Sequence, residues 1–108
     1  MATRLAAGML VSALLRRVEE AGGTGAVLAK GDATAGALLI QLAERGVLGP
    51  LLERRLDVNG QYRWSTTGPD EPEQRGDYIA RRRRSDPDLW VIELDVADGY
   101  RLVEEIAG

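Results

Sequence analysis

Apolar residues near the start of the chain recur at three- and four-residue steps, which is the spacing of one face of a helix. They are Leu5, Met9, Leu10, Ala13, Leu14, Val18 and Ala21, and most of the charged residues fall between them. The pattern predicts an amphipathic helix from about residue 4 to 21, with its apolar stripe facing the core. Gly22 and Gly23 then supply a left-handed C-terminal stop.

Two short runs that are almost continuously apolar follow, at residues 25–30 and 37–42. The turn-forming residues 31–36 between them favour pairing of the two runs as antiparallel strands. Because neither run alternates with polar residues, both are expected to be central strands covered on each face. A helix is the alternative for residues 35–45, since they include good helix formers and Gly46 could end it.

The strongest local signal is the dipeptide Asn59-Gly60. These residue types favour positive φ at both central positions of a type I′ turn, so residues 51–58 and 61–66 are predicted to form a β-hairpin. Alternation along the second strand places Tyr62 and Trp64 on one face.

Residues that interrupt helices and strands, together with charged residues, divide the last third of the chain into segments. The predicted elements are, in order, a polar mobile loop at 68–72, a helix over 73–84, a stop at 85–88, a central strand over 89–96 and a turn at Asp98-Gly99. Residues 100–106 are either a short return strand or a terminal helical turn. Acids in the first turn of the second helix and arginines in its last turn agree with the helix dipole.

These elements predict a single α+β domain over residues 1–108. It contains an antiparallel sheet of about five strands, an N-terminal helix and a second helix before the last main strand. The length of 108 residues is typical of one domain. Only about two-thirds of the unfolded surface is buried at this size, which leaves room for oligomerisation.

Composition excludes much familiar chemistry. The chain has no cysteine and no histidine, so it has no disulfides, no thiolate nucleophile, no zinc site of the usual kind and no serine–histidine machinery. A net charge of −3 does not favour nonspecific attraction to nucleic acid or to an anionic membrane. The apolar residues 5–15 are too short to span a bilayer and no cleavage site follows them, so we expect a cytoplasmic location.

The most conspicuous charged run is Arg81, Arg82, Arg83 and Arg84. With Arg75 it forms a candidate phosphate-binding patch for nucleic acid or a nucleotide. The favoured interpretation is a solvated helix end that suits the helix dipole and pairs with nearby carboxylates. No pattern of stacking aromatics accompanies the run, so nucleic acid is not the favoured partner.

Two acidic segments are further candidates for ligand binding. Asp32, Thr34 and the free amides of residues 31–36 are the groups to inspect for a small ligand, although the segment lacks the lysine of a phosphate-binding loop and turn chemistry explains it. Asp86 and Asp88, with Glu93 and Asp95, offer carboxylates to Mg²⁺ or Ca²⁺, but their spacing matches no EF-hand. Capping of a turn is the favoured role of Asp86 and Asp88, and we expect no metal and no cofactor.

Three segments taken together carry a family resemblance. Residues 31–38, the arginine run and residues 86–93, which begin Asp-Pro-Asp-Leu-Trp, resemble in their order the segments of domain-of-unknown-function family 1491. The chain resembles this family of short, mainly alphaproteobacterial proteins over nearly its whole length. The resemblance implies a bacterial cytoplasmic protein and supplies no activity, substrate or catalytic residue.

Three hypotheses for function follow. The leading one is a non-enzymatic binding or assembly module that acts through protein contacts, with a homo-oligomer or another protein as partner and no membrane. The second is a nucleic-acid or phospholigand binder that uses Arg75 and the arginine run. The third is a hydrolase or metal-dependent enzyme, which requires Asp32, Asp86 and Asp88 to converge in a cleft.

Overall fold

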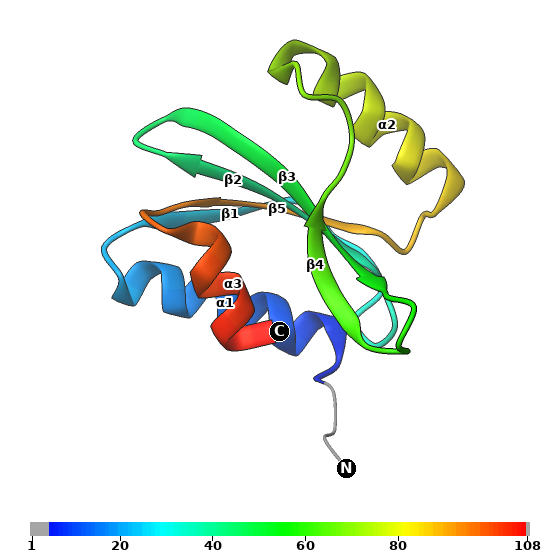
Figure 1. Ribbon diagram of the computed structural model, residues 1–108, viewed down its shortest axis with the longest axis horizontal. Coiled ribbons are helices and arrows are strands. Elements are labelled where there is room, and N and C mark those ends of the chain that lie inside the picture. Colours follow the sequence, from blue (N-terminus) through cyan, green and yellow to red (C-terminus); the bar gives the residue numbers. More distant parts are fainter. Residues whose placement is uncertain (1–4, 108) are drawn as a thin grey trace.

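The computed structural model describes residues 5–107 and places a five-stranded sheet between two layers of helices (Figure 1). In chain order the elements are α1 (Ala7–Glu20), β1 (Thr24–Ala29), β2 (Leu38–Glu44), β3 (Val47–Leu56), β4 (Tyr62–Thr66), the 3-10 turn η1 (Pro72–Gln74), α2 (Arg75–Ser85), β5 (Trp90–Asp95) and α3 (Gly99–Ala107). The predicted α+β architecture is confirmed, with a C-terminal helix in addition.

The strand order in the sheet is β1-β5-β2-β3-β4, so β5 lies between the first two strands. It pairs antiparallel with β1 and parallel with β2, and the predicted direct pairing of residues 25–30 with 37–42 is therefore wrong. The physical reason is burial on both faces. Val91 and Ile92, which point to opposite faces of β5, are both fully buried, and a strand of this kind is most stable in the middle of a sheet.

The two predicted central strands have different environments. β2 is buried on both faces along nearly its whole length, as expected. β1 lies at the sheet border, where Val27 is 43% and Leu28 56% exposed, so the prediction of a covered strand is wrong there. The helix alternative for residues 35–45 is also wrong, because consecutive residues Leu39 and Ile40 bury their side chains on opposite faces of the sheet.

A tight turn joins β2 to β3. Arg45 and Gly46 both have positive φ, 53° and 79°, the combination found in type I′ turns. Asp95, at the end of β5, stabilises the turn, since its carboxylate accepts hydrogen bonds from the backbone N–H of Arg45 at 2.8 Å and of Gly46 at 2.9 Å. Gly46 therefore ends a strand rather than the alternative helix.

The predicted hairpin of β3 and β4 is confirmed, with Leu56 paired to Tyr62. The predicted type I′ turn is wrong, because Gly60 has positive φ, 78°, whereas Asn59 does not. The side chain of Asp57 explains the difference. Its carboxylate accepts hydrogen bonds from the backbone N–H of Asn59 at 2.8 Å and of Gln61 at 2.9 Å, which fixes the turn from within.

The second and third helices follow the predictions. α2 begins at Arg75, after η1, which confirms the helix expected over residues 73–84. For residues 100–106 the helical alternative is confirmed and the return strand is wrong, since α3 spans Gly99–Ala107. Its ends are tied to β4: the Tyr100 hydroxyl donates to the carbonyl of Trp64 at 2.9 Å, and the Trp64 indole N–H donates to the carbonyl of Ala107 at 3.2 Å.

The helices cover opposite faces of the sheet (Figure 1). α1 and α3 enclose the larger core, to which α1 contributes the fully buried Leu14 and Val18. α1 begins at Ala7, and the predicted start near residue 4 lies outside the described residues. α2 covers a smaller cluster on the other face, with Tyr78 and Ile79 partly buried against it. None of the helices within residues 5–107 is long and apolar enough to cross a membrane.

The loop after β1 packs directly against the segment that leads into β5. The backbone N–H of Asp32 donates to the carbonyl of Asp88 at 3.0 Å, and the Trp90 indole N–H donates to the carbonyl of Asp32 at 2.7 Å. A methyl group on Gly31 or Gly36 would lie only 2.1 or 2.3 Å from the Asp88 carbonyl oxygen. The two segments that resemble the family therefore form one tightly packed unit.

Two glycine-to-alanine substitutions distinguish the effect of this close packing on stability from the effect of helix propensity. Gly31→Ala forces backbone apart at Asp88, so we expect the free energy of unfolding to fall by about 2 kcal/mol. Gly76→Ala, in α2, meets nothing within 4 Å, and we expect it to stabilise by roughly 0.5–1 kcal/mol. Urea unfolding followed by tryptophan fluorescence measures both, and equal effects at the two sites would contradict the close approach.

Candidate functional site

The three candidate aspartates lie in the paired loops, where two of their carboxylates cap turns. Asp32 accepts hydrogen bonds from the backbone N–H of Thr34 at 3.1 Å and of Ala35 at 2.7 Å. Asp86 accepts one from the N–H of Asp88 at 3.1 Å. Asp32 and Asp88 meet through their main chains. Across residues 5–107, no three or more acidic, histidine or cysteine residues are grouped so that they could hold a metal ion.

Thr34 lies beside a groove of about 540 Å³ at the start of α1. The groove is bounded by residues before and within α1, by the loop into β2 and by the β3–β4 hairpin; its lining residues are Leu5, Ala6, Ala7, Leu10, Thr34, Ala35, Gly36, Ala37, Leu38, Arg54 and Tyr62. The carbonyls of Thr34 and Ala33 accept hydrogen bonds from the N–H groups of Ala7 and Gly8 at 3.2 and 2.8 Å. The loop thus caps α1, and the first helix amides face protein carbonyls rather than the groove.

The arginines of α2 divide into two groups. Arg75 and Arg82 point into the protein, whereas Arg81, Arg83 and Arg84 are exposed. The division follows from helix geometry, because consecutive residues on a helix are distributed around its axis. The structure is needed to identify which of the arginines face inward.

Arg82 is held by a carboxylate on the sheet. Its guanidinium donates to both carboxylate oxygens of Glu53 on β3, at 2.9 and 2.5 Å, and to the hydroxyl of Tyr78 at 3.0 Å. Arg55 donates to the same carboxylate at 3.1 Å. The hydrogen bond from Arg82 is the main cause that lowers the pKa of Glu53 below its ordinary value, and in turn Glu53 raises the pKa of Arg82.

Arg75 fixes the start of α2 to an irregularity in β3. The register of β2 and β3 shifts beyond Gln41, where Gly49 and Pro50 bulge out of the ladder. The Arg75 guanidinium donates to the Gly49 carbonyl and, at 3.1 to 3.2 Å, to the carbonyls of Pro69 and Asp70. The Gln41 side chain donates to the Gly49 carbonyl as well, at 2.9 Å. Buried charge is thus satisfied by backbone carbonyls.

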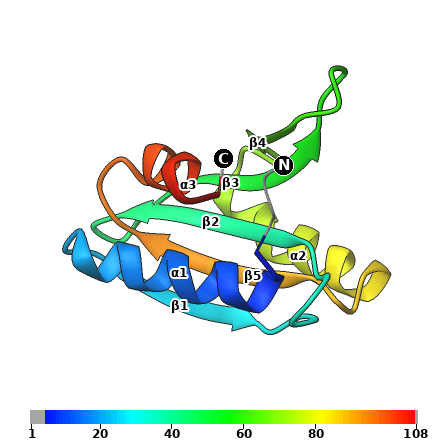
Figure 2. The ribbon, with the colours of Figure 1, turned by 90° about the horizontal axis from the view of Figure 1, so that it is seen from below.

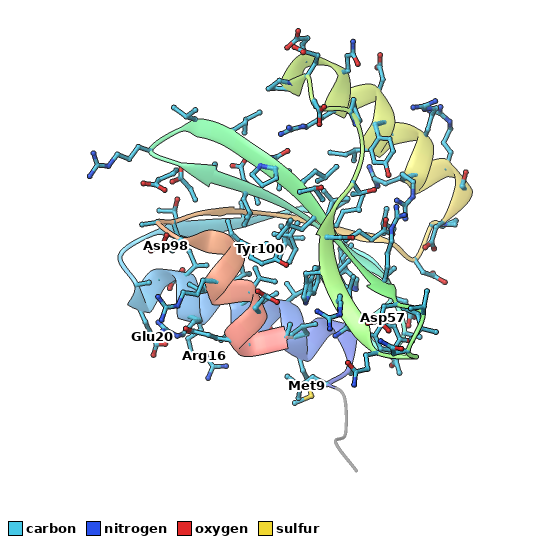
Figure 3. The ribbon with its side chains drawn as sticks, in the orientation of Figure 1. Met9, Arg16, Glu20, Asp57, Asp98 and Tyr100 are labelled. Carbon is cyan, nitrogen blue, oxygen red and sulfur yellow. The ribbon has the colours of Figure 1, made fainter. Side chains whose placement is uncertain are left out.

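Exposed apolar side chains lie on the β3–β4 hairpin and at the start of α1. We call Leu5, Met9, Leu56, Val58 and Tyr62 the hairpin surface; their exposed fractions are 47%, 62%, 60%, 100% and 44%. Leu5 and Tyr62 line the groove, and Leu56 lies opposite Tyr62 in the strand register. Asp57, at the tip of the hairpin in Figure 3, makes an ion pair with Arg63 at 2.8 Å.

Arg54 stiffens the base of the hairpin. Its guanidinium lies over the ring of Tyr62, 5.3 Å from the centroid, and over that of Trp64 at 5.6 Å. This contact confirms that Tyr62 and Trp64 share one face of β4. The two rings nevertheless differ in exposure, since Trp64 is buried and Tyr62 is half exposed. Tyr62 is the first residue of β4, next to the turn, whereas Trp64 lies farther along the strand.

The geometry therefore defines a class of protein: a small α+β domain with helices on both faces of a mixed sheet. It carries a groove and a hairpin with exposed apolar residues, and the carboxylates of Asp32 and Asp86 accept hydrogen bonds within turns. The family model described as "Protein of unknown function (DUF1491)" matches residues 5–104, and the chain belongs to this family. The search of curated proteins found no match.

Solved structures agree with this assignment. The crystal structure of a DUF1491 family protein from Caulobacter crescentus CB15 is 33% identical, with a TM-score of 0.79 over 91% of this chain and 94% of that one. The NMR structure of a DUF1491 family protein from the same organism has a TM-score of 0.78 at 33% identity, over 94% of each chain. Protein Atu0922 from A. tumefaciens is also 33% identical, with a TM-score of 0.74 over 89% of each chain.

Replacing arginines one at a time tests the division within α2. Arg82→Gln leaves the Glu53 carboxylate without its bidentate partner, and we expect the free energy of unfolding to fall by about 2 kcal/mol. Arg83→Gln removes an exposed guanidinium and should change it by less than about 0.5 kcal/mol. Urea titration at neutral pH measures both values. Equal losses would contradict the structural role of Arg82.

The lowered pKa of Glu53 makes stability depend on pH. A carboxylate whose pKa is lowered by folding stabilises the protein above its ordinary pKa of 4.5, and this contribution disappears as pH falls through the folded pKa. We therefore expect the stability advantage of the wild type over Glu53→Gln to be constant near neutral pH and to shrink below pH 4.5. Urea unfolding at a series of pH values measures the difference. Glu104→Gln, at an exposed position of α3, is the control, and an advantage unchanged in acid would refute the assignment.

Proposed function

We propose that this protein is a non-catalytic cytoplasmic binding module that acts by contacting another protein through the hairpin surface. The observation that carries the proposal is the exposure of five large apolar side chains on and beside a hairpin, with Val58 fully exposed at its turn. Large apolar side chains exposed on one element and beside it are typical of interaction sites.

The chemistry of the hairpin surface suits a protein partner. Tyrosine, methionine and arginine are enriched where proteins meet; here Tyr62 and Arg54 both line the groove, and Met9 is exposed on α1. The hairpin is held in one conformation by the Asp57 hydrogen bonds and by the stacking of Arg54. A rigid element loses little conformational entropy on binding, which favours affinity.

A second candidate is supported by the exposed arginines of α2. Arg81, Arg83 and Arg84 make no ion pair with the described residues, whereas Arg82 is engaged. Three free guanidinium groups in one helical turn suit an anionic ligand such as a phosphate-rich nucleic acid. Against it stand the net charge of −3 and the engagement of Arg75 in the fold.

Site-specific photo-crosslinking in the native cells tests the leading proposal. A benzophenone amino acid placed at Leu56 or at Val58 is expected to form a covalent adduct with a discrete protein, detected as a shifted band and identified by mass spectrometry. The same probe at Glu104, exposed on α3, is the matched control and should give no such band. The variant Met9→Ser should weaken the adduct from Val58.

Three results would argue against the leading proposal. Adducts absent at both hairpin positions, or equal at Glu104, would remove the role of the hairpin surface. An adduct with nucleic acid that disappears in the triple variant Arg81→Gln, Arg83→Gln and Arg84→Gln would favour the second candidate. Binding through those arginines must also weaken steeply with added salt.

A further inference from the structure

The border of the sheet at β1 has open hydrogen-bonding capacity. Among the described residues β1 pairs with β5 alone, and Figure 2 shows it at the free side of the sheet with α1 lying along it. In an edge strand, alternate N–H and C=O groups point away from the sheet, where another strand can bind them.

β1 lacks two of the features by which proteins usually protect such an edge, charged residues and proline, and its bulge at Leu28 lies near the end of the strand. Its six residues include no charge and no proline, and Val27 and Leu28 expose 43% and 56% of their surface. The opposite edge strand, β4, is different, because it carries the charged Arg63, whose side chain is 70% exposed. The β1 edge is apolar and uncharged, whereas the β4 edge at the other side of the sheet carries a charge. This difference indicates that β1 is normally covered.

We propose that β1 pairs with β1 of a second copy of this chain, antiparallel and about a twofold axis, so that one sheet runs through both copies. The register of β1 with β5 is regular from Thr24 to Val27, before the bulge at Leu28, and this regular part is the segment available for pairing. Self-pairing of one strand gives a closed dimer, because the same surface is used by both copies.

The charges that flank β1 select the second copy and the antiparallel direction. Glu19 and Glu20 are exposed at the end of α1, just before the strand, and Figure 3 shows Glu20 at the opposite end of α1 from Met9. Lys30 is exposed immediately after the strand. Antiparallel pairing brings Lys30 of each copy toward Glu20 of the other, whereas parallel pairing would place like charges together.

The helix above the edge adds apolar surface to the same contact. Leu15 of α1 is only partly buried, and it lies over Gly25 of β1, where an added methyl group would be 2.6 Å from its side chain. Two carboxylates at the negative end of α1 are unfavourable in the isolated chain, and an approaching lysine offsets them. The pairing therefore covers Leu15, Val27 and Leu28 together.

Sedimentation velocity over a wide range of protein concentration tests the inference. We expect a species of twice the chain mass of 11.7 kDa that dissociates on dilution. Leu28→Lys should yield monomers at all concentrations, while Val58→Lys, which puts the same charge on the hairpin, should leave the dimer intact. Circular dichroism shows whether each variant is folded.

Exchanging the charges at Lys30 and Glu20 tests the proposed dimer even if Leu28→Lys does not fold. Lys30→Glu should raise the dissociation constant about tenfold, since two symmetric pairs become repulsive. Adding Glu20→Lys to Lys30→Glu should restore it. A wild-type chain that is monomeric throughout, a dimer lost in Val58→Lys, or a double variant no better than Lys30→Glu would each overturn the inference. Photo-crosslinking from the hairpin is a separate measurement, so the proposed function can stand or fall independently.

Discussion

The insertion of β5 between β1 and β2 is the constraint on which the rest of the structure depends. Because β5 is buried on both faces, it requires helices above and below the sheet, and α1 with α3 and α2 supply them. The strand is also held at its start, where Trp90 donates to the Asp32 carbonyl at 2.7 Å and its own backbone N–H donates to Ala37 at 2.8 Å. With β5 in this position, β1 and β4 are the two border strands of the sheet.

The two faces of the sheet are stabilised by different forces. The face under α1 and α3 is an apolar core of the usual kind. The face under α2 depends on polar contacts, in which Arg75 binds backbone carbonyls and Arg82 binds Glu53. Since a partly buried ion pair costs desolvation, its geometry matters more than its presence. Arg75 and Arg82 therefore hold α2 against the sheet. The other arginines of the helix are exposed.

Local patterns along the chain were sufficient for most of the elements but not for their pairing. The stripe of α1, the Asn59-Gly60 turn region and the apolar run of β5 were all predicted from neighbouring residues. The order of strands depends on which strand buries both faces, and residues 25–30 and 89–96 both fit that description in sequence. The contacts of Glu53 with Arg82 and of Gln41 with Arg75 join distant segments, and no local spacing indicates them. The exposure of Leu56 and Val58 likewise depends on how far the hairpin extends from the rest of the domain, which no local pattern indicates.

The place of β5 in the sheet also affects how the chain folds while it is being synthesised. A ribosome synthesises β1 and β2 well before β5, yet Thr24 pairs with Asp95 and Leu38 with Trp90. The nascent polypeptide thus carries two apolar strands whose common neighbour does not yet exist. Pairings between such distant residues form slowly, and exposed strands are vulnerable to aggregation while they wait. Complete pairing of the sheet therefore requires translation of β5, and until then β1 and β2 lack their shared neighbour.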